Sequence, residues 1–559
     1  MMNFSNKLLL KLGKTSQKAT KKLDSFLEDW VSQHASEDDL KDSGHPWTKK
    51  EIDSANILAE QLKAISFQPL ISIIMPVYRP DFGFFGQVLD SIEHQSYTNW
   101  QLCICDDAGK DPKVSDLIEA FANRYPDQTS ISIHKENKHI CEASNSALAL
   151  AQGEFVVFVD HDDRLYPSAL AEIVRHLYVH DKPDMMYSDE EHIDELGRLS
   201  GKIFKKPDWD PILHLSTNYS THLSCYKTEL VKRLGGLRAG FEGAQDHDLA
   251  LRVSEKAEKI IHIPKSLYQW RIHENSTAAN VEGKPYALKS GVRAVEEAVR
   301  RRGIKAEVSV DVETLHYKLN FIAPASRPLV DIILLGDNDQ NKLKRCVQSV
   351  IRASDYDNFK IHTPIKLDKI NDGRLHLRPS SLEPTGEFWL KDKFLKGQYT
   401  AFLNISCEIL SPEWLLEAIG WLQIENIGCV FPKQIFADNR IFQAGFLYEK
   451  GSGFSRKYAG LADKSEEGFY FNQSPQTILA GSVDCFVMRR EDFFATKGLP
   501  SLFLNDDFRS IYFSQSIKTS LNKHNLYSPY AFVYNHKSFE DLPVKIDNQE
   551  LALLIKRGL

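Results

Sequence analysis

Short apolar runs alternate with longer amphipathic stretches between residue 69 and about residue 190. The run FVVFV at 155–159 is apolar at every position, and LISIIMP at 70–76 nearly so. Such runs are too short for helices and are typical of strands buried on both faces of a sheet. Between them, Val88, Leu89 and Ile92 recur at helical spacing. The pattern predicts an α/β domain with a parallel sheet made of strand–helix–strand units.

Two of the expected strands end in carboxylates. Further strands are expected at 100–105, near 131–134 and at 185–189, and further helices at 143–151 and from about 246. The strands at 100–105 and 155–159 run into two groups of acids: Asp106 and Asp107, and Asp160, Asp162 and Asp163. Ligands of open α/β sheets bind outside the carboxyl ends of the strands, so both groups are expected along one edge where a site would form.

Carboxylates this close together need a counter-charge. A hard divalent cation, Mg²⁺ or Mn²⁺, is the economical partner, and its coordination is typically completed by substrate phosphates. The acids therefore predict a metal site and a phosphate-bearing substrate. The structural alternative is an acidic, solvated turn that opens a helix at Pro167, because Asp is favoured at helix N-termini and Pro at their first position. Asp106 and Asp107 have a similar alternative as turn or helix caps.

A second acidic motif stands at the start of a predicted helix. GFEGAQDHDLALRV places Asp246 and Asp248 in its first turn, with Leu249, Leu251 and Val253 as the apolar positions. The helix dipole favours an acid there, which is the structural alternative for one of the two carboxylates. The helix dipole does not account for the glycine-rich sequence that precedes the helix.

Composition excludes several classes of protein. The net charge of −7 gives no electrostatic basis for binding nucleic acid, so no nucleic-acid partner is expected. The eight cysteines are scattered and form no CxxC pair, which argues against zinc and disulfides and favours a cytoplasmic location. No apolar run approaches the roughly 18 residues of a spanning helix, so a soluble or peripheral protein is expected.

The first 68 residues are predicted to form a basic helical segment. Six lysines precede the first acid, Asp24, and Phe4, Leu8 and Leu12 fall on one helical face. Such a segment suits peripheral contact with an anionic membrane surface, here the inner face of the cell membrane. A solvated helix that packs on the next domain is the alternative.

Six motifs in order resemble glycosyltransferase family 2, most closely its bacterial O-antigen and rhamnosyltransferase-like members. Between residues 69 and about 280 they are PVYRP, QSYTNWQLCICDDAGKDP, ASNSALALAQGEFVVFVDHDD, YSDEEHID, FEGAQDHDLALRV and YQWRIHENSTA. The resemblance implies a Rossmann-like GT-A domain, the nucleotide-diphospho-sugar transferase fold, and inverting transfer from a nucleotide-diphosphate sugar donor. The implied acceptor is a glycan or a lipid-linked acceptor in bacterial surface polysaccharide synthesis.

The resemblance also implies roles for residues of this sequence. The implied nucleotide-sugar contacts are Pro76, Val77, Tyr78, Asp106, Asp107, Asp160 and Arg271, the last near the leaving diphosphate. The implied ligands of Mg²⁺ or Mn²⁺ are Asp160, Asp162 and Asp163, and the implied catalytic base is Asp246. The sequence departs from the family pattern at Arg79 for Asn, at Lys138-His139 for Gly-Gly and at Gln245 for Glu. These departures leave the donor sugar open.

The second half repeats the first without its acids. PLVDIILL echoes PLISIIMP, Tyr356 and Phe359 stand over Tyr97 and Trp100, and GQYTAFLNISCEIL echoes GEFVVFVDHDDRLY. Asn404 and Ser406 then replace Asp160 and Asp162, and neutral oxygens balance a divalent ion poorly. The repeat predicts a degenerate GT-A-like domain without metal-dependent catalysis, although Asp506-Asp507 resembles a base motif.

The predicted organisation has four parts: a basic segment at 1–68, a catalytic domain at 69–320, the degenerate domain at 326–545 and a tail at 546–559. Two rival functions stay open. A sugar nucleotidyltransferase would open with a glycine-rich triphosphate loop, where this chain has VYRPDFGFF. A non-catalytic glycan-binding or assembly protein would not need the carboxylates of the first half.

Overall fold

The computed structural model describes residues 47–273 and 285–538, apart from 338, 364, 368, 369, 378–394, 450–452, 466–469 and 501–505, and then 540, 544, 546, 550, 551 and 554. The chain divides into two compact units, residues 1–214 with 218–298, and residues 215–217 with 299–559. The hairpin at 306–321 thus groups with the second unit, whereas the sequence analysis assigned most of it to the first domain. The basic stretch 1–46 lies outside the described residues.

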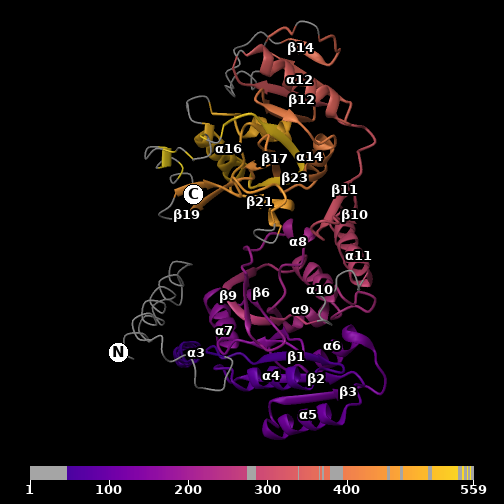
Figure 1. Ribbon diagram of the computed structural model, residues 1–559, viewed down its shortest axis with the longest axis vertical. Coiled ribbons are helices and arrows are strands. Elements are labelled where there is room, and N and C mark those ends of the chain that lie inside the picture. Colours follow the sequence, from indigo (N-terminus) through magenta and orange to yellow (C-terminus); the bar gives the residue numbers. More distant parts are fainter. Residues whose placement is uncertain are drawn as a thin grey trace. The chain divides into compact units, whose positions relative to one another are not determined.

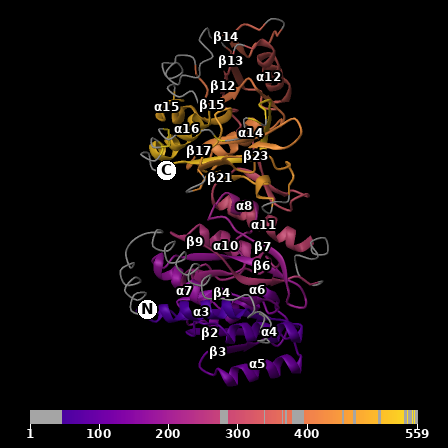
Figure 2. The same ribbon diagram turned by 60° about the vertical axis from the view of Figure 1, so that its left-hand side comes forward.

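The first unit alternates strands and helices as the hydrophobic pattern predicts (Figures 1 and 2). Its elements up to the acidic loop are α3 (Lys49–Leu62), β1 (Ile71–Val77), α4 (Phe82–Glu93), β2 (Trp100–Asp106), α5 (Pro112–Arg124), β3 (Thr129–Ile133), α6 (His139–Leu150) and β4 (Phe155–Phe158). Beyond that loop follow β5 (Arg164–Leu165), α7 (Ala169–Val179), β6 (Met185–Ile193), β7 (Leu199–Phe204), α8 (Leu213–Ser216), β8 (Ser224–Lys227), α9 (Thr228–Arg233), α10 (Gln245–Ser254), β9 (Ile260–Arg271) and α11 (Pro285–Arg301).

The sheet is mixed, which corrects the prediction of a parallel sheet. Its order is β3-β2-β1-β4-β8-β6-β9-β5, with β7 paired to β6. Strands β3, β2, β1 and β4 are parallel, whereas β8 runs antiparallel to both β4 and β6. Parallel neighbours require a crossover, usually a helix. Helices α4, α5 and α6 supply it among β1 to β4, and α9 and α10 lie in the connection that leads to β9, which is parallel to β6. Strand β8 follows β7 with only the short α8 between them, and it pairs antiparallel with both of its neighbours.

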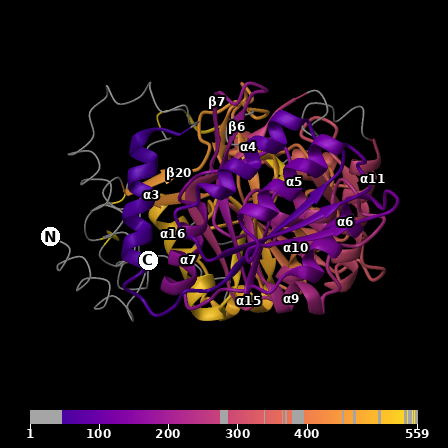
Figure 3. The same ribbon diagram turned by 90° about the horizontal axis from the view of Figure 1, so that it is seen from below.

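The core of the first unit lies on one face of this sheet. Alternate positions of β1, among them Ile71, Ile73 and Met75, are fully buried against α4, α5 and α7. Helix α3 adds Leu58 and Leu62 to the same cluster. On the opposite face α6 covers β1, β2 and β3. Figure 3 looks onto these helices from the end of the unit.

The acidic edge forms as the sequence predicts. Strands β2 and β4 both pair in parallel with β1, so their carboxyl ends lie on either side of the end of β1. Asp106 is in register with Val77, and the loop from Asp160 to Asp163 follows β4 directly.

The second unit begins with β10 (Ala306–Val310) and β11 (Tyr317–Phe321), followed by β12 (Val330–Leu335), α12 (Gln340–Ala353), β13 (Phe359–Thr363), β14 (Leu375–Leu377), β15 (Tyr399–Asn404), β16 (Cys407–Ile409), α14 (Trp414–Leu422) and β17 (Ile427–Ile435). It continues with β18 (Ile441–Gln443), β19 (Phe446–Glu449), β20 (Gly453–Arg456), η2 (Phe471–Gln473), β21 (Gln476–Ile478), β22 (Cys485–Arg489), α15 (Arg490–Ala495), α16 (Asp506–Leu521) and β23 (His524–Asn535). Leu554, in the expected tail, is fully buried against Phe508 and Ile511 of this unit.

The second unit has the strand order of the first. Its sheet runs β14-β13-β12-β15-β22-β17-β23-β16, and every pairing has the same direction as its counterpart in the first unit. Local contacts repeat too: the Tyr97 hydroxyl donates to the Pro69 carbonyl at 2.7 Å, and that of Tyr356 donates to the Pro328 carbonyl at 2.6 Å. The duplication predicted from sequence is therefore confirmed at the level of topology.

A glycine is required at the same place in both units. A Cβ at Gly153 would lie 2.5 Å from the Leu70 carbonyl oxygen, and one at Gly397 would lie 2.6 Å from that of Leu329. Both glycines come just before a strand that packs beside the first strand of its sheet. The close approach of the two backbones leaves no room for a side chain.

Glu417 of α14 makes the stability of the second unit depend on pH. It is 5% exposed, and burial raises its pKa to about 7, although the Trp421 indole and the Ser528 hydroxyl both donate to it at 2.7 Å. The folded state thus holds this proton more tightly than the unfolded chain. The stabilising effect is complete below about pH 4.5 and is lost as the pH rises to about 7, a change of roughly 3 kcal/mol.

We expect Glu417→Gln to remove that pH dependence, because an amide of the same shape keeps an acceptor oxygen and does not ionise. In urea unfolding the variant should be more stable than the native chain at pH 8, and the difference should shrink at pH 5. Glu425→Gln, at an exposed position after the same helix, is the matched control. Parallel pH profiles for the native chain and Glu417→Gln would contradict the prediction.

Candidate active site

An open pocket lies at the carboxyl end of β1 and β4. Its polar lining includes Asp160, His222 and Asp246, and its floor includes Pro76 and Tyr226. Sites for small-molecule ligands typically combine apolar walls with a few converging polar groups, as this pocket does. Of the residues predicted from sequence, the structure places Pro76, Asp160 and Asp246 in this pocket.

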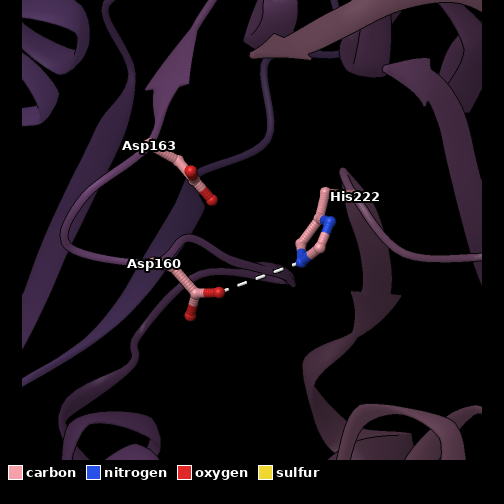
Figure 4. A group of neighbouring side chains, drawn as sticks. All are labelled: Asp160, Asp163 and His222. Carbon is pink, nitrogen blue, oxygen red and sulfur yellow. Dashed lines mark ion pairs between the residues drawn. The ribbon is translucent and has the colours of Figure 1, made fainter. Parts of the chain in front are cut away.

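The loop after β4 presents its carboxylates in different directions. The Asp160 side chain is 46% exposed and faces His222, with Oδ2 3.8 Å from Nε2 (Figure 4). Asp163 is buried, and it accepts hydrogen bonds from the Tyr268 hydroxyl at 2.5 Å and the Arg271 backbone N–H at 2.7 Å. Burial, followed by the neighbouring carboxylates of Asp162 and Asp160, raises the pKa of Asp163 well above its ordinary value. A positive charge brought to this loop would relieve that crowding.

His222 is held in place by a buried ion pair. It precedes β8, and its backbone N–H donates to Glu190 of β6 at 2.7 Å. The Lys206 ammonium donates to the same carboxylate at 3.0 Å and to the carbonyls of Thr221 and His222. Burial disfavours protonation of His222, but Glu190 and Asp160 outweigh burial and raise the pKa of the imidazole to about 9.

The residues of this loop fit a divalent cation. Asp160, Asp163 and His222 each offer a ligand atom, and these atoms lie within 4.8 Å of one another. Asp162 and His273 form a second pair of possible metal ligands. Oδ2 of Asp162 lies 2.9 Å from Nε2 of His273, which stands just after β9. Carboxylate oxygens suit Mg²⁺ or Mn²⁺, whereas imidazole is a ligand that these hard ions use less than softer metals do. The predicted ligands are thus joined by two histidines that the sequence analysis did not single out.

Asp246 and Asp248 have opposite surroundings although both stand in the first turn of α10. Asp246 is half-buried, lines the pocket, and accepts only the backbone N–H of His247, at 2.9 Å, among the hydrogen bonds of the described residues. Asp248 is fully buried and accepts from Arg252 at 2.8 Å and from Arg238. Two residues along a helix amount to a turn of about 200°, which separates the side chains. Asp246 can therefore meet a substrate, whereas Asp248 fixes the helix.

We expect Asp248→Asn to destabilise the first unit by about 3 kcal/mol, because it leaves Arg238 and the largely buried Arg252 without their carboxylate. The midpoint of urea unfolding measures the effect. Glu258→Gln, at an exposed position just beyond α10, serves as control. A midpoint equal to that of the control would show that the two arginines do not depend on this carboxylate.

The acids after β2 accept hydrogen bonds from neighbouring groups of the protein. Asp107 is buried and accepts from Nδ1 of His134 at 2.7 Å and from the Lys138 N–H at 2.8 Å. Asp106 accepts from the Gly109 N–H at 2.8 Å. Asp107 thus resembles a structural cap, the alternative considered from sequence, while its predicted ligand contact remains untested.

The remaining predicted contacts lie around the end of β1 and the end of β9. Val77 is buried, and its carbonyl accepts from the Asp107 N–H. Tyr78 is exposed, with the Arg79 guanidinium 5.2 Å from its ring. Arg271 is fully buried, and it donates to the Asp162 carbonyl at 2.7 Å and to Gln87 at 2.7 Å. In this arrangement Arg271 holds the acidic loop.

Sequence reasoning missed His222, His273, Glu190 and Lys206. The motifs YSDEEHID and YQWRIHENSTA contain two of these residues, but no spacing within them showed that they meet the acidic loop. His222 and Lys206 stand in no recognised motif. His222 reaches the site because β8 is inserted between β4 and β6, and Lys206 follows β7, which pairs with β6.

Two further observations bear on the sequence expectations. All eight cysteines are buried and free. Within the described part of the chain, no helix combines the length and the apolar character needed to cross a bilayer.

Comparison with known proteins agrees with the geometry. Residues 72–235 match the family model "Glycosyl transferase family 2". An uncharacterized protein, y4gI, of Sinorhizobium fredii is 32% identical over 89% of this chain and 57% of its own length. The O-antigen biosynthesis protein RfbC of Myxococcus xanthus is 29% identical over 79% of this chain and 36% of its own length. The chain therefore spans about half or less of these relatives.

Solved structures are more distant. A crystal structure of TarS from S. aureus in complex with UDP is 20% identical over 42% of this chain and 71% of that chain, with a TM-score of 0.32. At that score the likeness carries no argument about the ligand. Residues 72–235 nevertheless match a glycosyltransferase family 2 domain, and the strand order of the first unit agrees with the GT-A-type α/β fold expected from sequence.

Proposed function

We propose that the chain is an inverting, metal-dependent glycosyltransferase. It would move a sugar from a nucleotide-diphosphate donor to a hydroxyl of a glycan or lipid-linked acceptor. The observation that carries the proposal is that Asp246 and the pair Asp160–His222 line one pocket of a glycosyltransferase family 2 domain. An acidic residue with a free side and a cluster of cation ligands are what such a transfer requires.

The donor would lie along the carboxyl edge of β1, β2 and β4. Pro76, Val77, Tyr78, Asp106 and Asp107 would surround the nucleotide. Tyr78 is the exposed aromatic of this set, so its ring is available to a base. The diphosphate would then reach the loop after β4.

The acidic loop would hold Mg²⁺ or Mn²⁺ through Asp160, Asp162 and Asp163, with His222 and His273 beside them. When bound, the ion neutralises the charge that develops on the leaving diphosphate. Glu190 and Lys206 keep His222 in position, and Arg271 does the same for the loop through the Asp162 carbonyl. A direct contact of Arg271 with the diphosphate stays a prediction from the resemblance.

Asp246 would act on the acceptor. Inversion is one in-line displacement at the anomeric carbon, so a single base on the acceptor hydroxyl is sufficient. The backbone N–H of His247 binds Oδ1 of Asp246 and leaves Oδ2 to accept the proton. A retaining hydrolase would instead need two carboxylates flanking the bond it cleaves, without a nucleotide donor.

A place in bacterial surface polysaccharide synthesis is supported by the likeness to the O-antigen biosynthesis protein. Contact of the basic segment with the inner membrane face remains a prediction, since that segment lies outside the described residues.

Hydrolysis or transfer from a panel of nucleotide-diphosphate sugars tests the proposal. Nucleoside diphosphate should be released when Mn²⁺ or Mg²⁺ is present and not when a chelator is added. Asp116→Asn, at an exposed position on α5, is a control for loss of a carboxylate elsewhere on the unit. Release at an equal rate with chelator would contradict metal dependence, and no turnover of any donor with an acceptor mixture would favour the non-catalytic rival.

A further inference from the structure

A lysine stands at the place in the second unit where the first unit has its cation ligands. The Lys537 ammonium lies 2.8 and 3.0 Å from the two carboxylate oxygens of Asp484, and 3.3 Å from Oδ2 of Asp506. The Asp484 side chain is 4% exposed, and that of Lys537 is 23% exposed. Burial opposes ionisation of Asp484, but Lys537 outweighs it and holds the pKa of that carboxyl below its ordinary value.

Strand register shows that this is the position of the first site. Phe155 of β4 pairs with Lys227 of β8, and its counterpart Tyr399 pairs with Arg489 of β22. Counting back five residues along both strands places Asp484 over His222. Asp484 also contacts the loop that replaces the acidic loop, since its carbonyl accepts from the Asn404 N–H at 2.7 Å. Asn404 is the counterpart of Asp160, the partner of His222.

The lysine itself comes from an equivalent segment. Gln269 of β9 pairs with Arg164 of β5, and Tyr534 of β23 pairs with Glu408 of β16 at the matching place. Lys537 therefore follows β23 one residue before the counterpart of His273. Asp506 begins α16, as Asp246 stands in the first turn of α10. The segments before β22, at the start of α16 and after β23, whose counterparts converge on the first site, thus meet at Lys537.

We propose that Lys537 is the resident cation of the second unit: its ammonium takes the place of the divalent ion proposed for the first, so that this unit binds no divalent cation at its equivalent site. The inference rests on the proposed metal site of the first unit for its comparison.

The charges around Lys537 are balanced within the chain. Asp484 and Asp506 face Lys537, and the Arg509 guanidinium lies 3.1 Å from Oδ1 of Asp506. Two carboxylates and two cations leave no excess negative charge to recruit a divalent ion. Because Lys537 and Arg509 are already paired with these carboxylates, the cluster has no excess positive charge to attract a nucleotide diphosphate.

Uptake of Mn²⁺ by the full chain tests the inference, with the electron paramagnetic resonance signal of free Mn²⁺ as readout. The native chain should take up one ion, and Asp160→Asn/Asp162→Asn should take up none. An ion that remains in that double variant and is lost on adding Asp484→Asn would overturn the inference. A native chain that takes up no ion would contradict the proposed function instead, and so the two failures are distinguishable.

A double-mutant cycle tests the pairing of Lys537 with Asp484 through the midpoint of thermal unfolding. Lys537→Met and Asp484→Asn should each lower the midpoint more than Lys464→Met does, where an exposed lysine pairs with Glu313 at 2.6 Å. In the double variant Lys537→Met/Asp484→Asn the midpoint of thermal unfolding should return most of the way to the native value, because neither charge is then buried alone. If a single variant does not fold, a double variant that does fold shows that the two charges depend on each other. Losses that simply add would show that Lys537 does not neutralise Asp484.

Discussion

Asp246→Asn is expected to slow sugar transfer by a factor of about 10² to 10⁴ while the nucleotide still binds with near-native affinity. The amide keeps the shape of the side chain and its hydrogen bond from the His247 N–H, but it has no basicity for the acceptor proton. Because the base acts on the acceptor, the loss should appear in the rate of transfer at saturating donor. Steady-state kinetics and calorimetric titration of the nucleoside diphosphate measure the two quantities separately.

Asp248→Asn is the informative comparison, because it lies on the same helical turn and its effect is expected on stability. Glu258→Gln controls for loss of a carboxylate near the same helix. If Asp246→Asn weakens nucleotide binding as much as it slows transfer, the residue serves the donor and is not the base. Transfer at the native rate in Asp246→Asn would remove it from the mechanism.

Asp162→Asn is expected to abolish metal-dependent binding of the nucleotide and to slow transfer at least a thousandfold. The loop needs its negative charge to recruit the ion, and loss of the ion raises the barrier by several kcal/mol, at about 1.4 kcal/mol per tenfold in rate. In the native chain the carboxylates would otherwise repel a bare diphosphate. Titration of nucleoside diphosphate with Mn²⁺ and with chelator is the measurement.

The control for Asp162→Asn is Asp116→Asn, which should keep native affinity in Mn²⁺. Two further variants, His222→Ala and His273→Ala, show which donor pair holds the ion more strongly, Asp160 with His222 or Asp162 with His273. Equal affinity of the native chain with and without chelator would contradict a metal at this loop. The Asp162→Asn result would then need another explanation, such as altered contacts of His273.

Most of the fold could be predicted from local sequence patterns. Whether a segment is a strand or a helix depends on which of its own positions are apolar, so β1, β2, β4 and α10 were predictable from their residues alone. The duplication was predictable for the same reason, because both halves keep the apolar positions that build the sheet. The direction of β8 was not predictable, since it depends on how the chain returns after β7.

The residues of the candidate site also fall into a group that was predictable from local sequence and a group that was not. The sequence by itself determined that acids follow β2 and β4 and that Asp246 opens a helix, because these residues are fixed by the strand or helix that carries them. Only the tertiary structure decided that His222 faces Asp160, that Asp107 is hydrogen-bonded to His134, and that Lys537 forms an ion pair with Asp484. Such pairs join segments far apart in the chain. Their meeting is set by the order in which strands pair, which no local pattern of hydrophobic and polar residues encodes.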